Sequence, residues 1–356
     1  MKTLSRWLLR ESIIIPLISV FAGLIIGAII MMFGGYNPFE AYQALFNKAF
    51  GSVYGVGETI RTITPLIFTG LAVAFAFRTG LFNIGAEGQF IMGSLAAAYV
   101  GIMLDLPAII HMPLAVIVGG IVGGLWGGIA GFLKASRGVH EVITTIMLNW
   151  IALYLSNYLI RTHLLEKGQQ KSETLAQSSW LSFSFLTDIF NNARVHFGFL
   201  IAILCAIVFY VILQKMKQGY ELRSVGLNPH AAEYAGINVK SNIIKAMVIS
   251  GMFAGLGGAV EVLGVTHNVI ILPAFQGYGF DGIAVALLGG NAAFGSVVGA
   301  FLLGTLTFGA TGMKLGAGVP FEIINIVIAL VIYFVASRLI FKRLMNALNV
   351  NKQEEQ

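Results

Sequence analysis

The sequence predicts an all-α fold, a polytopic bundle of transmembrane helices, and three observations lead to this prediction. Lys and Arg number 22 and Asp and Glu number 16, so that charged residues make up only 11% of the 356 residues, against roughly 25% in soluble domains. Apolar residues account for 57%, more than a soluble protein of this size can cover with so few charges. Several apolar stretches also reach the roughly 20 residues that a spanning helix needs.

We expect about ten membrane spans. The stretch at 83–104 opens with a polar run, and the stretch at 277–291 is short and carries Asp281, so these two resemble broken helices more than complete spans. The expected spans are 13–33, 58–77, 83–104, 112–133, 141–160, 197–214, 243–264, 277–291, 296–312 and 321–340.

The distribution of basic residues predicts the orientation. With ten spans and a cytoplasmic N-terminus, 15 of the 22 basic residues lie on the cytoplasmic side, as the positive-inside rule requires. Both termini are then cytoplasmic, the loop 161–196 is extracytoplasmic and the loop 215–242 is cytoplasmic. No stretch divides the chain, so we expect a single transmembrane domain over 1–356.

The sequence offers no catalytic or metal-binding motif. It contains no phosphate-binding P-loop, and it has no Gly-x-Ser-x-Gly nucleophile motif. His140-Glu141 begins like a zinc-protease motif, but position 144 is threonine and the second histidine is missing. We therefore expect a protein that is not an enzyme, with no cofactor or metal on this chain.

Glycines recur at every fourth position in the stretch 112–133. One ridge runs through Gly119, Gly123, Gly127 and Gly131, and a parallel ridge runs through Gly120, Gly124 and Gly128. Such faces let helices approach closely, either within the subunit or between subunits.

Two glycine-rich segments place polar side chains at membrane depth, where they are costly and commonly functional. The residues that we expect along a solute path are Phe82, Asn83, Glu87 and Gln89 in the first segment and Tyr278, Phe280 and Asp281 in the second. Both segments begin short apolar runs, as in broken helices that line a path. Inverted repeats would bring them together near the middle of the bilayer. The alternative for Glu87 and Asp281 is structural, since a carboxylate also caps or pairs near a helix N-terminus.

Further polar residues lie in or near the expected spans. Asn149 and Asn157 fall on roughly one face of a helix and serve either interhelical hydrogen bonds or the path. Glu58 and Arg61 stand near a span end and are expected at the membrane interface. Glu261 stands near the outer end of its span, with no role assigned.

The cytoplasmic loop contains a short helix. Asn228 can cap it, Pro229 suits its first position, and Gly236 can end it. A helix of about two turns is unstable alone and must dock, either on its own bundle or on a separate cytoplasmic protein.

The segment that follows, Ala231-Ala232-Glu233-x-Ala235-Gly236-Ile237-Asn238-Val239, resembles the coupling loop of ABC-importer permeases. The similarity is to the family that serves branched-chain amino acids, ribose-like sugars and nucleosides. The run from Phe77 to Gln89 is similar to the early signature of its nucleoside branch, and the run from Asp281 to Asn291 resembles its late glycine-rich signature. The resemblance identifies the coupling residues as Asn228, Pro229, Ala231, Ala232, Glu233 and Gly236.

The resemblance implies a permease subunit that moves purine nucleosides such as guanosine by alternating access. It implies a separate cytoplasmic ATPase that uses ATP, an extracytoplasmic binding lipoprotein and a second, related permease subunit in the cell membrane. The alternatives are an ion-coupled secondary transporter with Glu87 and Asp281 as carriers, an ABC permease for a sugar or an amino acid, and a membrane enzyme.

Overall fold

The computed structural model describes residues 11–337, and its regular structure in that range is helical apart from isolated β-bridges. The bridges pair Leu165 with Ser172 and Lys171 with Ile270. The all-α class is therefore confirmed. Some of the basic residues that supported the orientation lie near the two termini, outside the described residues. The last three residues of the predicted span 321–340 also lie outside them.

Each of the ten predicted spans coincides with a helix. These helices are α2 (Glu11–Phe33), α4 (Val53–Arg78), α5 (Ala86–Met103), α6 (Ala108–Arg137), α7 (Glu141–Leu159), α9 (Gly198–Lys215), α12 (Val239–Glu261), α13 (Tyr278–Leu288), α14 (Ala293–Ala317) and α15 (Phe321–Ala336). Two of them continue as single π-helical turns, α7 into η1 (Ile160–Leu164) and α12 into η3 (Val262–Thr266).

Within the described part of the chain, six helices are long and apolar enough to cross a membrane: α4, α6, α7 with η1, α9, α12 with η3, and α14. Shorter apolar helices occur in α2, α13 and α15. The 11 residues of α13 extend over about 17 Å, roughly half of the hydrocarbon thickness. Six membrane-capable helices are thus established, and the total of ten spans stays a prediction.

Three helices were not predicted, because the search for spans followed apolar length alone. They are α3 (Pro38–Phe50), α8 (Ser184–Ile189) and α10 (Lys217–Leu227). The sequence does carry a start signal for α3, since Asn37 accepts a hydrogen bond from the backbone N–H of Phe39 (3.0 Å) and Pro38 follows it.

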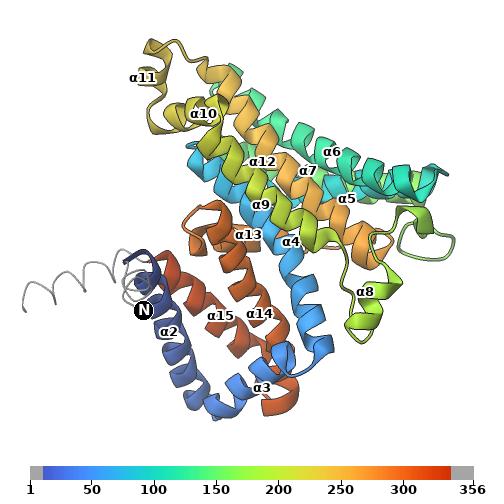
Figure 1. The fold of residues 1–356 in the computed structure, drawn as a ribbon, viewed down its shortest axis with the longest axis vertical. Coiled ribbons are helices and arrows are strands. Elements are labelled where there is room, and N and C mark those ends of the chain that lie inside the picture. Colours follow the sequence, from blue (N-terminus) through green and yellow to red (C-terminus); the bar gives the residue numbers. More distant parts are fainter. Residues whose placement is uncertain (1–10, 338–356) are drawn as a thin grey trace, which may run out of the picture. The chain divides into compact units, whose positions relative to one another are not determined.

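The residues Val53–Gly304 form one compact unit in which α12 packs along α6, α5 and α4 (Figure 1). Glycine allows the close contact between α6 and α12: a Cβ on Gly123 would lie 2.5 Å from the Cα of Gly255. The second glycine ridge of α6 also faces α12, since a Cβ on Gly124 would lie 2.5 Å from the side chain of Met252. The prediction that these ridges pack within the subunit is confirmed.

This unit also positions the two long connections. In Figure 1, α8, from the loop 161–196, and α11 (Pro229–Tyr234), from the loop 215–242, lie at opposite ends of the unit. The helix α9 joins the two regions. The arrangement agrees with loops on opposite sides of a membrane.

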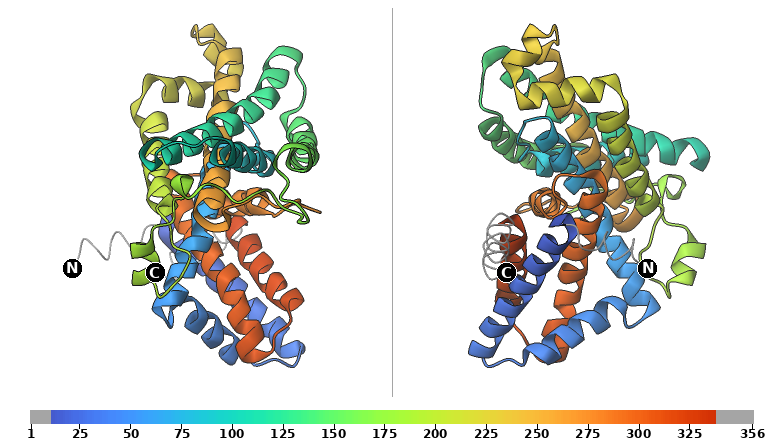
Figure 2. Two further views of the ribbon diagram at one scale, coloured as in Figure 1. Left: turned by 90° about the vertical axis from the view of Figure 1, so that its right-hand side faces the viewer. Right: turned by 60° about the vertical axis from the view of Figure 1, so that its left-hand side comes forward.

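The second compact unit comprises Met1–Ser52 and Thr305–Gln356, so that α14 contributes to both units. Within it α2 and α15 lie side by side (Figure 2). Gly23 and Gly27 of α2 face Val331 and Val327 of α15, where a Cβ would meet those residues at 2.6 and 2.7 Å. The hydroxyl of Tyr42 in α3 donates a 2.6 Å hydrogen bond to the carbonyl of Leu24.

Candidate functional site

The two predicted path segments meet at the carboxylate of Glu87. Glu87 stands in the first turn of α5, and α13 begins at Tyr278. The backbone N–H of Gly277 donates to Oε1 of Glu87 (2.9 Å), and the N–H of Gly279 donates to Oε2 (2.6 Å). Glu87 therefore satisfies two of the free N–H groups at the start of α13.

This junction depends on glycine at two positions. Gly277 has φ = +94°, a left-handed conformation that side chains disfavour. At Gly279, a Cβ would lie 2.1 Å from the backbone nitrogen of Glu87. The glycines that suggested a broken helix thus serve both a turn and a close approach of two backbones.

Asn83 and Gln89 belong to a set of hydrogen bonds that we call the amide network, which consists of Asn83, Gln89, Asn149 and Ser250. Asn83 Nδ2 donates to Gln89 Oε1 (2.8 Å) and to Ser250 Oγ (2.8 Å), and Asn83 Oδ1 accepts from the N–H of Gly85 (2.9 Å). Ser250 Oγ in turn donates to the carbonyl of Ala72 (2.6 Å). All four side chains are buried.

The two asparagines of α7 link elements of the bundle. Asn149 accepts from the N–H of Gly88 (2.8 Å) and donates to the carbonyl of Ile84 (3.1 Å). Asn157 exchanges two hydrogen bonds with the backbone of Leu272, at 2.8 and 2.9 Å. Asn149 thus fills the interhelical role, one of the two alternatives that the sequence left open, whereas Asn157 holds the non-helical segment 267–277 against α7.

The aromatic residues of the predicted path divide into separate groups. Phe82 stacks on Phe77, with ring centroids 4.9 Å apart. Tyr278 lies against Phe90 at 5.1 Å. Phe280 is partly exposed and touches the ring of Phe275 edge-on, with centroids 5.7 Å apart.

Of the two acids predicted along the solute path, Asp281 is exposed and Glu87 is buried. Asp281 forms no ion pair within residues 11–337. The structure therefore separates the path residues into an enclosed group (Asn83, Glu87 and Gln89) and an accessible group (Phe280 and Asp281), with Tyr278 partly buried between them.

Sequence reasoning missed two ion pairs, which we call the ion-pair cluster: Glu58, Arg61, Arg194 and Glu261. Arg61 Nη2 lies 2.8 Å from Glu261 Oε1. Arg194 donates three hydrogen bonds to the Glu58 carboxylate: its backbone N–H and Nε bond to Oε1 at 2.9 and 3.1 Å, and its Nη2 bonds to Oε2 at 2.6 Å. Glu58 is 1% exposed within the protein, and the location of Glu58 and Arg61 at the membrane interface stays a prediction.

Opposite charges in different apolar stretches were the available signal for the pair of Arg61 and Glu261, since buried charges require partners; Arg194, the partner of Glu58, lies in a loop and gave no such signal. His196 lies beside the cluster, just before α9. Burial, followed by the positive charge of Arg61, lowers the pKa of His196 to about 4. It is therefore neutral at physiological pH.

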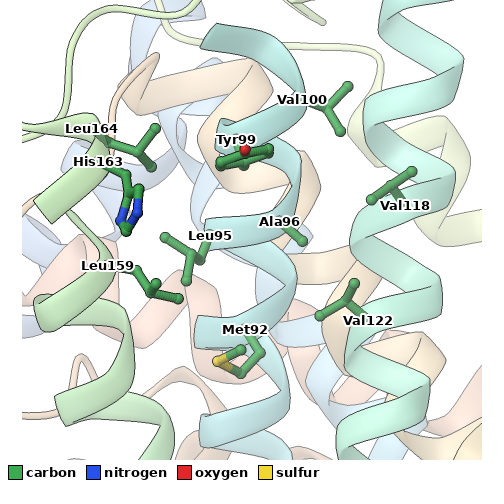
Figure 3. Close-up of a pocket in the computed structure, with 10 residues that line it drawn as sticks. All are labelled: Met92, Leu95, Ala96, Tyr99, Val100, Val118, Val122, Leu159, His163 and Leu164. Carbon is green, nitrogen blue, oxygen red and sulfur yellow. The ribbon is translucent and has the colours of Figure 1, made fainter. Parts of the chain in front are cut away.

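A small cavity of mixed lining adjoins Glu261. Its volume is about 60 Å³, and polar residues (Ser94, Ser156, Glu261, Thr266, Asn268 and Gln276) and apolar residues (Phe90, Ile91, Val262, Val269, Ile270 and Leu272) line it in equal number. Another pocket, of about 430 Å³, opens between α5, α6 and the end of α7 (Figure 3). Apart from Tyr99 and His163 its lining is aliphatic or sulfur-containing, so it suits a hydrocarbon chain better than a polar solute.

The coupling segment has the caps that its sequence predicts. Asn228 Oδ1 accepts from the N–H of Ala231 (3.1 Å) at the start of α11. Gly236 has φ = +78°, and the N–H groups of Gly236 and Ile237 bond back to the carbonyls of Glu233 (2.9 Å) and Ala232 (3.0 Å). This is the hydrogen-bond pattern of a helix end closed by glycine.

The helix α11 is docked on its own unit by one face. Ala232 is buried, whereas the side chains of Tyr234 and Leu227 are 98% and 88% exposed. Two large apolar groups therefore stand free at this end of the unit. The sequence analysis did not single out these two residues.

Comparisons with known proteins give the class of the chain. The model of the family described as the permease component of branched-chain amino acid transport systems matches residues 55–336. The chain belongs to this family of permeases and is a multi-pass membrane protein.

Its relatives match over most of its length. It is 51% identical to the guanosine ABC transporter permease protein NupP of Bacillus subtilis, over 94% of this chain and 96% of that one. It is 38% identical to the nucleoside ABC transporter permease protein NupB of Lactococcus lactis, over 97% and 96%. It is 32% identical to the glucose ABC transporter permease protein TsgB13 of Haloferax volcanii, over 96% and 91%. No match was found among the solved structures.

Proposed function

We propose that this chain is the transmembrane permease subunit of an ABC importer that moves purine nucleosides such as guanosine across the cytoplasmic membrane. The observation that carries the proposal is the 51% identity to a guanosine permease over nearly the whole of both chains. The nucleoside permease of Lactococcus lactis, at 38%, supports the same class of solute.

The proposed partners are a cytoplasmic ATPase that hydrolyses ATP, an extracytoplasmic binding lipoprotein and a second, related permease. The names of the relatives support the last of these, since Bacillus subtilis and Lactococcus lactis each have two similar permeases, NupP with NupQ and NupB with NupC. This chain would act without catalysis of its own, as one transmembrane permease domain over 1–356.

The proposed coupling element is α11 with its flanking residues, and its contact with the ATPase would move the bundle between its two access states. The exposed side chains of Leu227 and Tyr234 support an apolar contact with a partner. The caps at Asn228 and Gly236 support a rigid element, because both ends of this short helix are fixed by hydrogen bonds.

The proposed solute path runs along the accessible face of α13 at Phe280 and Asp281, with Tyr278 and Phe82 as further aromatic candidates. Asn83, Glu87 and Gln89 would support the wall of the path, because their polar groups are engaged with one another or with backbone. Asp281→Ala should then reduce uptake without lowering the amount of protein in the membrane. Unchanged uptake would remove Asp281 from the path.

The proposed topology has ten spans, both termini cytoplasmic, 161–196 outside and 215–242 inside. The positions of α8 and α11 at opposite ends of their unit support it (Figure 1). Reporter fusions after Gln356 and within 168–180 should report inside and outside, respectively, and the opposite pattern would overturn the orientation.

Uptake of labelled guanosine tests the proposed function. Cells that express this chain with its partner subunits should accumulate guanosine, and loss of the ATPase should abolish accumulation while dissipating the ion gradient at constant ATP should not. Glucose is the competitor to include, because a glucose permease is 32% identical. Uptake that survives loss of the ATPase but stops with the ion gradient would favour a secondary transporter.

A further inference from the structure

Only one of the two carboxylate oxygens of Glu261 has a hydrogen-bond partner of ordinary geometry among the described residues. Its Oε1 pairs with Arg61, but its Oε2 is buried with no hydrogen-bond partner among the described residues, and so is Nε of Arg61. The whole residue is 5% exposed. A carboxyl oxygen that is buried and unpaired is unfavourable, and in native proteins such a group calls for an explanation.

The neighbouring glutamate shows that the fold can satisfy such a group. Glu58 accepts three hydrogen bonds from Arg194, shared between both of its oxygens. Both residues are buried glutamates paired with an arginine in the same compact unit. The open oxygen therefore distinguishes Glu261 from Glu58.

Glu261 lines the cavity described above, together with Ser94, Ser156 and Gln276. Phe90 belongs to the same wall, and Tyr278 packs against Phe90 with its hydroxyl near enough to the Glu261 carboxylate to act as a hydrogen-bond donor to it. An acceptor oxygen beside polar side chains and aromatic rings suits a planar solute that carries N–H donors.

At about 60 Å³ the cavity is too small for a nucleoside, so binding there would require it to expand. One wall comes from the segment 267–277, which is not helical, and another from the π-helical turn η3, a form that is frequent at functional sites. Displacing the non-helical wall would enlarge the cavity without unfolding a helix.

We infer that Glu261 is a solute-binding residue of this permease, which accepts hydrogen bonds through its free carboxylate oxygen from the N–H donors of a purine base. The inference rests on the proposed function. Guanine carries two adjacent donor groups, at N1 and at the exocyclic amine, whereas adenine has no N1 hydrogen. Glu261 should therefore favour guanosine over adenosine.

The test is the kinetics of guanosine and adenosine uptake by the complete transporter with Glu261→Gln. A hydrogen bond to a charged group contributes roughly ten- to a hundredfold to affinity, so KM for guanosine should rise at least tenfold while KM for adenosine changes less than threefold. Glu58→Gln is the matched control. It removes the same charge from an ion pair without a free oxygen, and it should leave the ratio of the two KM values unchanged.

The outcomes distinguish failure of the proposed function from failure of the inference about Glu261. If the wild-type transporter takes up no nucleoside, the proposed function fails and the inference fails with it. If the wild type transports guanosine and Glu261→Gln leaves KM unchanged, or changes both nucleosides equally, the inference alone is overturned. If Glu261→Gln does not reach the membrane, Gln276→Ala replaces it. This exposed side chain lines the same cavity, so its removal should raise KM for guanosine at least threefold, and an unchanged KM would contradict the site.

Discussion

The amide network and the ion-pair cluster are both polar, each has buried members and each includes a residue of α12, yet they differ in how completely their hydrogen-bonding groups are satisfied. In the amide network the side chains of Asn83, Gln89 and Ser250 bond to one another and to backbone. In the ion-pair cluster, Arg61 and Glu261 each keep a buried polar atom without a partner in the described part of the chain.

The difference suggests two roles for buried polar residues, one in holding helices together and one in binding solute. A closed network fixes the relative positions of the helices and has no group left to bind a solute. An open one bears an energetic cost in the fold that a bound solute can relieve. Polar residues at membrane depth therefore need to be judged by their free hydrogen-bonding groups as well as by their depth.

The largest effect is expected at Glu87, which closes the junction between α5 and α13. Glu87→Ala would leave the N–H groups of Gly277 and Gly279 without an acceptor, at about 1–3 kcal/mol each. The variant should accumulate poorly in the membrane and melt at a lower temperature. Glu87→Gln keeps an acceptor oxygen, so its amount in the membrane and its melting temperature should fall less. Wild-type amount and melting temperature in Glu87→Ala would show that the junction is not held by this carboxylate.

The two regions should also respond differently to pH, because the amide network has no titratable group and the ion-pair cluster adjoins His196. The pKa of His196 is lowered to about 4 by burial and by Arg61, from an ordinary value near 6.5. Protonation therefore favours the unfolded state, so stability is complete above pH 6.5 and declines as the pH falls toward 4. The loss between pH 7.5 and pH 5 should be about 2 kcal/mol.

Melting temperatures of the purified complex across this range measure the effect. His196→Gln should flatten the pH dependence, although His267, which also faces His196 and whose own pKa is lowered by burial, will keep part of it. An identical slope in His196→Gln and the wild type would contradict the assignment.

A smaller effect is expected at Gly236, which lies outside both networks. Its left-handed conformation disfavours a β-branched side chain, at about 1–2 kcal/mol, although a Cβ there would meet no atom within 4 Å. Gly236→Val should weaken docking of the ATPase roughly tenfold, read as reduced stimulation of ATP hydrolysis by the loaded binding protein. Gly236→Asn tolerates the left-handed conformation better and should lie closer to the wild type. Unimpaired stimulation in the valine variant would remove α11 from the coupling role.

Local signals predicted local structure well. Apolar length located ten helices, the caps of α11 follow from Asn228 and Gly236, and the glycine ridges of α6 indicated a close helix contact without naming its partner, which is α12. The missed helices α3 and α10 are too polar to be found by apolar length.

The site was harder to predict because its partners are distant in the chain. Glu87 bonds to residues about 190 positions away, and Arg61 pairs with a residue 200 positions away. Sequence alone indicates which polar residues are buried in the membrane, but which of their atoms remain free depends on tertiary packing.

Solute-dependent melting of the purified complex tests the central claim, that the open cluster binds solute and the closed network supports the fold. We compare the wild type with Glu261→Gln and Asn83→Ala at increasing guanosine concentration, since a ligand that binds the folded state raises the melting temperature. Asn83→Ala should melt lower than the wild type but respond to the same guanosine concentrations. Glu261→Gln should need at least ten times more guanosine for the same rise. The reverse pattern, with normal guanosine dependence in Glu261→Gln and a weakened response in Asn83→Ala, would contradict the account.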